Sequence, residues 1–190
     1  MNKPKIALLI DLASLKVSCE GFKKLLAEIE EEYEVAYVKF YSYVAKRNRD
    51  FNEYIGAKGY DAVTPVASKR RNKLDTRQVI DGTKLSVNST VDAVGLAVGE
   101  GDILPIVTEL KQSGKDVVEI AVEQCAYSDA FSSFIPVNVS YLREGYAAPT
   151  TKRAPKPAKE KKPVAPKQNE YTAEVNKIFE GRSLLNKYRR

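Results

Sequence analysis

The chain has 190 residues, 43% of them hydrophobic, which is enough to bury the core of one domain. It contains no histidine, and this excludes Ser-His and Cys-His nucleophile pairs, imidazole general bases and HExxH metal sites. The net charge of +6 is unevenly spread, because residues 1–149 carry 19 Lys/Arg against 21 Asp/Glu (−2) and residues 150–190 carry 12 against 4 (+8).

The first predicted element is a buried strand at residues 5–10, an apolar run that ends at Asp11. A helix-compatible stretch follows from about Ser14 to Glu32. The apolar run is too short for the core of a signal peptide, and no stretch approaches the roughly 20 apolar residues that span a bilayer. We therefore expect a cytoplasmic protein that makes no contact with a membrane.

The strand–helix–strand order then continues. Residues 33–44 are rich in Val, Tyr and Phe, which favours a strand. A basic loop at residues 68–73 precedes a helix predicted at residues 75–87, in which Ile80 and Val87 share one face. These elements lie in the order expected of a repeated strand–crossover unit.

The second half of the domain repeats the same alternation. A strand at residues 91–98 and a turn at residues 99–101 lead to a helix predicted to begin at Asp102 and to close at Ser113-Gly114. Residues 117–122 predict another buried strand. The alternation predicts an α/β fold with a doubly wound, mostly parallel sheet and helices on both faces. The apolar stripe of the helix is formed by Ile103, Ile106, Val107 and Leu110.

The chain is predicted to divide into three parts, of which residues 1–148 form the α/β domain. Residues 149–170 are dominated by Pro, Ala and Lys, a composition that favours a disordered linker. Residues 171–190 regain apolar spacing and predict a short amphipathic basic helix that could dock on a protein partner. The basic tail is typical of an arm that binds polyanions, although a tail that only aids solubility has the same composition.

Five acidic residues stand where this fold could bring them together, near the carboxyl ends of strands: Asp11, Asp75, Asp81, Glu100 and Asp102. Carboxylates gathered without intervening lysines repel one another, and a hard cation such as Mg²⁺ or Mn²⁺ relieves that repulsion. Such ions can support phosphodiester hydrolysis without any histidine. Each acid also has an ordinary explanation, because an Asp at a helix start can be an N-cap and an Asp on a helix face can be solvated.

Three segments resemble the NYN domain family (LabA-like) of the PIN-like nuclease superfamily. Residues 5–15, KIALLIDLASL, are similar to its opening strand and Asp-Gly-x-Asn-Leu turn. Residues 72–85, NKLDTRQVIDGTKL, resemble its Lys-Gly-Val-Asp segment with a second Asp six positions on. Residues 91–115, VDAVGLAVGEGDILPIVTELKQSGK, resemble its most diagnostic stretch, a strand leading to Ser-Gly-Asp-Ser-Asp-Phe and an apolar helix ended by Gly-Lys. The resemblance implies a PIN-like, Rossmann-like three-layer fold and metal-dependent RNA cleavage.

The resemblance also implies a site. Mg or Mn would be held by the acidic residues, with Asp11, Asp75 and Asp102 catalytic and with Asp81 and Glu100 as further ligands or supporting residues. The chain departs from the family pattern close to these acids, and Glu100 itself stands where the family has its first Asp. Where the family has Gly, Asn, Lys, Ser and a late Asp, this chain has, in that order, Leu12, Ser14, Asn72, Val98 and Asn138.

RNA is the expected partner. The basic loop directly before Asp75 would draw a polyanion toward the acids, although a solvated loop that only neutralises the charge of nearby acids would have the same composition. Four tyrosines could stack on bases, namely Tyr37, Tyr41, Tyr43 and Tyr54, yet the alternation of Tyr41 and Tyr43 fits one face of a strand equally well. The expected RNA-binding residues are Lys69, Arg70, Arg71, Lys73 and Ser14.

Two other functions remain open from the sequence. The first is a noncatalytic NYN-fold regulator that binds RNA or a protein, which the departures near the acids favour. The second is a Rossmann-like nucleotide-binding protein that uses Gly99-Glu100-Gly101 as a phosphate turn, but this turn lacks the third glycine of that fingerprint. A homo-oligomer is compatible with either function. Cys19 and Cys125 lack any CxxC partner and are expected to be structural.

Overall fold

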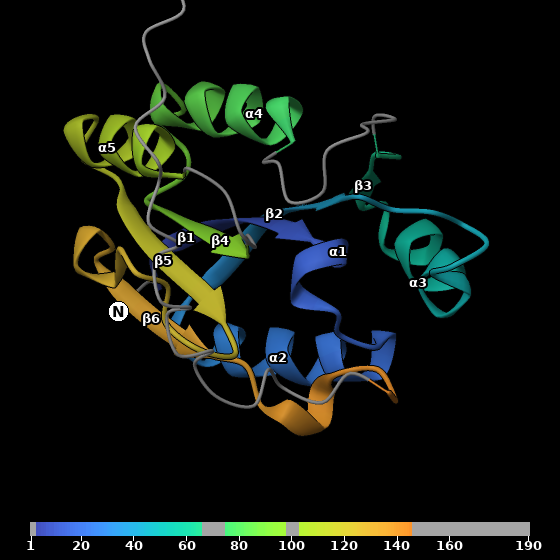
Figure 1. The fold of residues 1–190 in the computed structure, drawn as a ribbon. Helices are drawn as coiled ribbons and strands as arrows, with labels where there is room; N and C mark the ends of the chain where they lie inside the picture. Colours follow the sequence, from blue (N-terminus) through green and yellow to red (C-terminus); the bar gives the residue numbers. More distant parts are fainter. Residues whose placement is uncertain (1–2, 66–74, 98–102, 146–190) are drawn as a thin grey trace, which may run out of the picture. The chain divides into compact units, whose positions relative to one another are not determined.

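The computed structural model describes residues 3–65, 75–97 and 103–145, and its strands form one six-stranded sheet (Figure 1). The sheet order is β3-β2-β1-β4-β5-β6, and every pairing is parallel. Pairing moves outward from β1 in both directions, which is the doubly wound arrangement predicted from the sequence. The strands are β1 (Lys5–Asp11), β2 (Glu34–Tyr41), β3 (Asp61–Ala62), β4 (Ala93–Ala97), β5 (Asp116–Ala121) and β6 (Ser133–Pro136).

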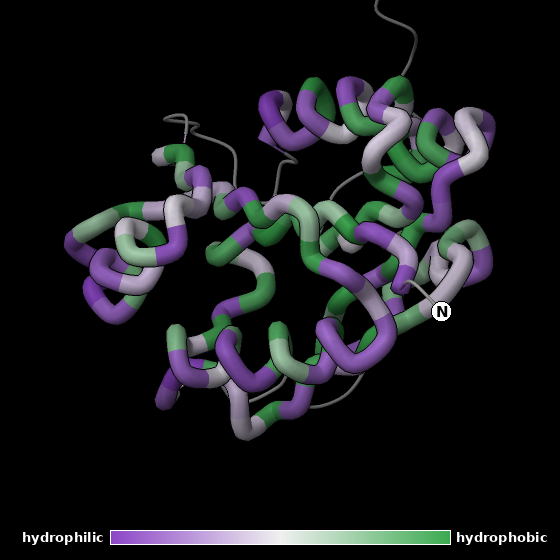
Figure 2. Tube along the Cα trace, turned by 180° about the vertical axis from the view of Figure 1, so that it is seen from behind, coloured by the Kyte–Doolittle hydropathy of each residue, from purple (hydrophilic) through white to green (hydrophobic). Residues whose placement is uncertain are grey.

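Helices connect the strands and cover both faces of the sheet (Figure 1). Apolar residues concentrate in the sheet and on the helix sides that face it, while the outer helix surfaces are largely hydrophilic (Figure 2). The helices are α1 (Leu12–Leu15), α2 (Cys19–Glu32), α3 (Arg49–Lys58), α4 (Thr76–Ser86) and α5 (Leu104–Gln112), with short 3-10 turns η1 (Ser128–Ala130) and η2 (Val139–Tyr141).

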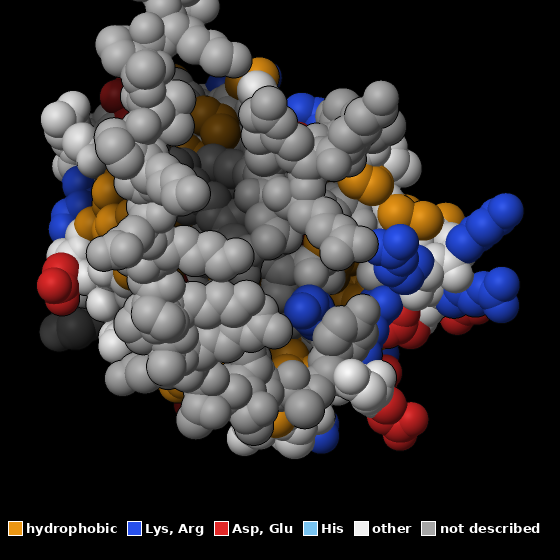
Figure 3. All heavy atoms as spheres, viewed as in Figure 1, with side chains coloured by type: hydrophobic (Ala, Val, Ile, Leu, Met, Phe, Trp, Pro, Cys, Tyr) orange, Lys and Arg blue, Asp and Glu red, His pale blue; other side chains and the backbone are white. Residues whose placement is uncertain are grey.

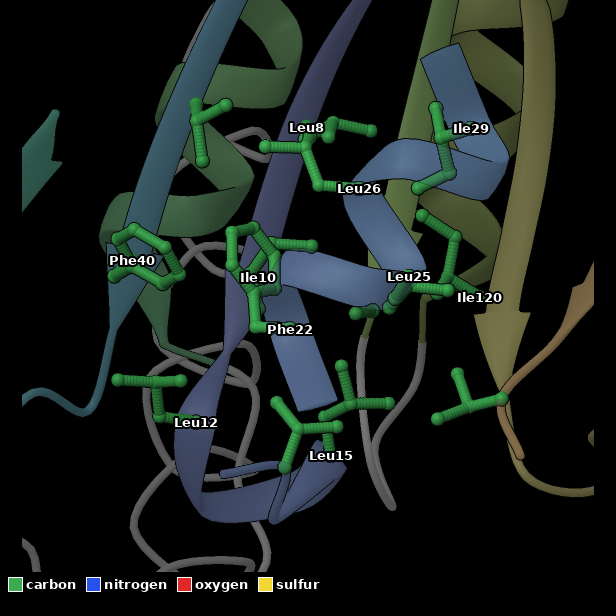
Figure 4. Close-up of a cluster of buried hydrophobic side chains, with 14 of the residues drawn as sticks. Leu8, Ile10, Leu12, Leu15, Phe22, Leu25, Leu26, Ile29, Phe40 and Ile120 are labelled. Atoms are coloured by element: carbon green, nitrogen blue, oxygen red, sulfur yellow. The ribbon is translucent and has the colours of Figure 1, made fainter. Parts of the chain in front are cut away.

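One core cluster lies between the sheet and α2. The even-numbered side chains of β1 point into it, and Leu8 and Ile10 are fully buried there. Phe22 of α2 packs edge-on against Phe40 of β2 with ring centroids 5.0 Å apart, and leucines of α1 and α2 complete the cluster (Figure 4). Because side chains alternate along a strand, the odd-numbered residues of β1 must face the opposite helices.

The second core cluster lies on that opposite face, under α4 and α5. Ala7 and Leu9 of β1 are buried in it beside Leu85 of α4. The predicted stripe of α5 is confirmed, since Ile103, Ile106, Val107 and Leu110 are all buried. Asp11 also has an odd number, so it extends from β1 toward the face that carries α4.

The prediction of one continuous helix from Ser14 to Glu32 is wrong. The chain forms two helices, because Lys16 ends α1 in the left-handed conformation with φ 56°. Ser18 then starts α2 as its N-cap and accepts a hydrogen bond from the Gly21 N–H. The break keeps α1 at the end of β1, directly after Asp11.

The buried face of α4 is not the one that the spacing of its apolar residues predicted. Ile80 and Val87 are 48% and 85% exposed, so the apolar face that they share is not the one that packs on the sheet. Gln78, Gly82 and Leu85 are the residues that α4 buries. Strand β6 had no prediction of its own in the sequence.

The predicted linker at residues 149–170 and helix at residues 171–190 lie outside the described residues. Among the helices of the described part, none has the length and apolar character to span a membrane.

Candidate acidic site

The candidate site lies where β1 and β2 end. Asp11 is the last residue of β1, and its register partner on β2 is Tyr41, the last residue of that strand. Strand β1 has β2 on one side and β4 on the other, so Asp11 lies at the end of the strand from which the sheet extends in both directions. Ligands of doubly wound sheets bind outside the carboxyl ends of strands at this kind of position.

Asp11 is fixed by its own short helix. Its Oδ1 accepts a hydrogen bond of 3.1 Å from the Ala13 N–H, which makes it the N-cap of α1. Its Oδ2 accepts a hydrogen bond from the Ser14 hydroxyl. No lysine or arginine of the described residues forms an ion pair with it. Asp11 is therefore oriented, but its negative charge is not neutralised by a neighbouring cation in the part of the chain described.

Asp81 reaches the same region from α4. Its Oδ2 accepts a hydrogen bond of 2.7 Å from the Tyr41 hydroxyl and lies 2.8 Å from Lys39 Nζ. The side chains of Lys39 and Asp81 are only 16% and 18% exposed. Burial alone would raise the pKa of Asp81, but the hydrogen bonds from Lys39 and Tyr41 outweigh it and lower the pKa below its ordinary value. Burial, and then the bond to Asp81, raises the pKa of Tyr41, which stays protonated as a donor.

Asp75 is held by a different cation. It is the N-cap of α4, and its Oδ1 accepts from the Arg77 N–H at 3.0 Å. The Arg77 guanidinium grips both carboxylate oxygens, with Nε 3.0 Å from Oδ1 and Nη2 2.6 Å from Oδ2, and it also donates to the Thr64 carbonyl. This hydrogen bonding lowers the pKa of Asp75, so the carboxylate is ionised at neutral pH.

The expectation that no cations intervene among the acids is therefore not met. Lys39 pairs with Asp81 and Arg77 pairs with Asp75. Within the described residues, no three acidic, cysteine or histidine side chains come close enough to hold one metal ion. Glu100 and Asp102 lie outside the described residues, as does the basic loop with Lys69, Arg70, Arg71 and Lys73.

Carboxylate oxygen is nevertheless the donor type that Mg²⁺ and Mn²⁺ prefer, and Asp11 offers it without a competing cation from the described residues. Asp11 therefore fits a hard cation, while Asp75 and Asp81 fit one only if they exchange their present partners. The predicted role of Ser14 in RNA binding stays a prediction, and its hydroxyl is used here to orient Asp11.

Sequence reasoning missed two residues that shape the site. Lys39 lies between Tyr37 and Tyr41 on the same face of β2. A charged residue at an alternating position of a face that points inward was the sequence feature that could have indicated it. Gln78 is 1% exposed, and its Nε2 donates to the Leu9 carbonyl at 3.4 Å, which ties α4 to β1 just below Asp11. Its position three residues after Asp75, on the buried face of α4, was the corresponding signal.

The sequence matches the NYN domain family over residues 5–138, which is more than half of the chain. A search of curated proteins found no match. Among solved structures, a crystal structure of an oxidoreductase from Thermotoga maritima is similar at 14% sequence identity and a TM-score of 0.35, covering 67% of this chain and 32% of that one. This chain spans about a third of the length of that oxidoreductase, and a likeness at this level supports no conclusion about fold or activity.

Proposed function

The chain belongs to the NYN domain family, a family of predicted ribonucleases of the PIN-like type, and we propose that it hydrolyses RNA phosphodiesters at a metal-dependent acidic site. The observation that carries the proposal is Asp11, an oriented carboxylate without a cationic partner among the described residues, at the carboxyl end of a central parallel strand. Tyr41, its register partner, binds Asp81 and so brings a second carboxylate to the same end of the sheet.

The proposed ligands are Asp11, Asp75, Asp81, Glu100 and Asp102. A bound divalent ion would supply Lewis-acid activation of water and stabilisation of the leaving oxygen. The chain itself keeps the acids ready for that role. Metal ligands must be deprotonated. Lys39 and Tyr41 lower the pKa of Asp81, and Arg77 lowers the pKa of Asp75.

Lys39 and Arg77 have a second role in this proposal. Each is a cation held beside a carboxylate by a short contact, of 2.8 Å for Lys39 Nζ and 2.6 Å for Arg77 Nη2. An RNA phosphate arriving at the carboxyl ends of β1 and β2 would meet these two cations as well as the acids. They would offset part of the repulsion between carboxylates and phosphate, and the predicted basic loop would add to this attraction.

The second candidate function is a noncatalytic NYN-fold regulator that binds RNA. It is favoured by the same two ion pairs, because a carboxylate already neutralised by Lys39 or Arg77 gains less from a metal ion. In that case, Asp75 and Asp81 are structural acids, and RNA is bound without being cut.

The test is cleavage of a mixed pool of single-stranded and hairpin RNA in Mn²⁺ and in EDTA. Asp11→Asn should abolish metal-dependent cleavage while the fold is retained, since Asn also serves as an N-cap. Asp116→Asn is the matched control, because Asp116 is exposed at the opposite, amino end of β5. Cleavage that survives in Asp11→Asn argues against the nuclease proposal, and inactivity of the wild type with RNA still bound supports the regulator.

A further inference from the structure

A hollow of about 360 Å³ lies between β2 and α4 and shares Asp81 with the acidic site. This volume is at the lower end of the roughly 300–1,000 Å³ that small-ligand pockets occupy. Its wall on one side is Tyr37 of β2, on the other Asp81 and Lys84 of α4, and its floor includes Asn88 and Thr90 from the turn that follows α4. The lining therefore combines an aromatic ring with charged, amide and hydroxyl groups.

The hollow shares Asp81 with the proposed catalytic site and extends from there toward the first half of β2 and the turn before β4. The same carboxylate that lines the hollow accepts the hydrogen bond from Tyr41, the register partner of Asp11. Lys84, one turn further along α4, is close enough for its charge to help lower the pKa of Asp81. A chain of nucleotides that passes the carboxyl end of β1 can thus extend along α4 into this hollow.

The chemistry of the lining suits a nucleobase. The Tyr37 hydroxyl donates to Asp61 Oδ2 at 2.7 Å, so its ring is held in place on the outer part of the sheet. Thr90 donates to Asn88 Oδ1 through both its N–H, at 2.9 Å, and its hydroxyl, at 2.7 Å. This leaves the Asn88 amide nitrogen, which has no acceptor among the described residues, to donate to a base edge.

We propose that this hollow binds one unstacked nucleobase of the single-stranded RNA whose backbone lies at the acidic site. The base contacts the Tyr37 ring, the Asn88 amide reads its edge, and Lys84, in the last turn of α4, contacts the adjoining phosphate. The inference rests on RNA being the ligand of the proposed function, but it does not require that the RNA be cut.

The experiment compares two fluorescent oligoribonucleotides of equal length in EDTA, one with all its bases and one with an abasic ribose-phosphate backbone. Ala36→Leu fills the hollow from an exposed position on β2. We expect it to weaken binding of the base-containing oligonucleotide by about five- to tenfold, the scale of one stacked base, and to leave the abasic one unchanged. Lys84→Ala should weaken both, and Lys58→Ala, which removes the equivalent last-turn lysine of α3, should weaken neither.

An equal loss for both oligonucleotides with Ala36→Leu, or no loss, overturns the proposal, because the hollow then holds backbone or nothing. A measurement on the wild type removes any dependence on how the variant folds. Ribonucleoside 5′-monophosphates should shift the amide resonances of residues 88–91, and the absence of such shifts also overturns it. Cleavage of RNA without base-dependent binding here would leave the nuclease proposal standing alone, whereas base-dependent binding without cleavage would support the hollow and reject the nuclease.

Discussion

At the scale of single residues, the properties of the site depend on which cations and hydrogen-bond donors contact each carboxylate. Asp81 is largely removed from solvent, and a buried carboxylate without partners would be protonated or would destabilise the fold. Lys39 and Tyr41 prevent this by supplying a cation and a hydroxyl donor at 2.8 and 2.7 Å. Asp11 accepts two hydrogen bonds but forms no ion pair with a lysine or arginine of the described residues, and this asymmetry is why it carries the functional proposal.

The lowered pKa of Asp75 predicts a dependence of stability on acid pH. In the unfolded chain an Asp titrates near pH 3.9, about its ordinary value, whereas in the folded chain Arg77 holds the pKa lower. Between these two values the unfolded state binds more protons, so stability decreases as the pH falls through this window and is constant well above it. We expect Asp75→Asn to flatten the fall of the unfolding free energy below about pH 4, measured by urea titration at each pH.

The variant Asp116→Asn serves as the control for that measurement, because Asp116 forms no ion pair with any described residue and is exposed. It should leave the slope of the wild type unchanged. Equal slopes for wild type and Asp75→Asn would show that the Arg77 contact does not stabilise the folded chain in solution.

At the scale of elements, the sequence predicted most strands and helices because their signals are local. The apolar run of β1 and the stripe of α5 are readable as periodicity, and both are confirmed. The break at Lys16 was missed, since it depends on a left-handed residue that is not Gly and on Ser18 capping the next helix. Such a break is decided by tertiary packing rather than by the propensity of Lys.

Packing of η2 against α2 provides a prediction at this scale. A Cβ at Gly21 would lie 2.1 Å from the Tyr141 carbonyl oxygen, which also accepts the Ser18 N–H at 2.9 Å. Because the obstacle is backbone, Gly21→Ala should lower the unfolding free energy by about 1–3 kcal/mol, despite the better helix propensity of Ala. Gly56→Ala in α3 has nothing within 4 Å and should instead raise it by about 0.5–1 kcal/mol.

Urea unfolding monitored by circular dichroism measures both substitutions. The pair is informative because each places the same methyl group in a helix, so propensity contributes similarly and the difference reports the contact with Tyr141. If the two variants changed the unfolding free energy alike, the close approach of η2 to α2 would not be a fixed feature of the protein.

At the scale of the whole molecule, the sequence predicted the fold class more fully than the site. The sequence patterns predicted the parallel arrangement of the strands and the position of Asp11 at the end of the first strand, because both follow from the order of strands and helices along the chain. The pairing of Lys39 with Asp81 joins β2 to α4, and the hollow beside Asp81 is formed by the same two elements and the following turn. Neither has a local signature, because both depend on which side chains meet after the sheet has assembled.

The net charge is distributed unevenly along the chain, and the last prediction follows from this distribution. Residues 1–149 have a net charge of −2 and residues 150–190 a net charge of +8. On the face shown in Figure 3, lysine and arginine side chains lie next to acidic ones over α3, so the described part of that face carries both signs. RNA attraction at long range should therefore come mostly from residues 150–190, whichever function is correct.

Counterion release makes this measurable. The affinity for single-stranded RNA should fall with salt by a slope of about 0.7 for each phosphate that a Lys or Arg neutralises. Replacing the 12 Lys/Arg of residues 150–190 with Gln should reduce that slope and weaken binding at low salt by more than about tenfold. Thermal unfolding of residues 1–149 should not change, which separates lost attraction from a lost fold. An unchanged slope would place the RNA contacts on the domain itself, and Lys39, Arg77 and Lys84 would then be the cations to substitute next.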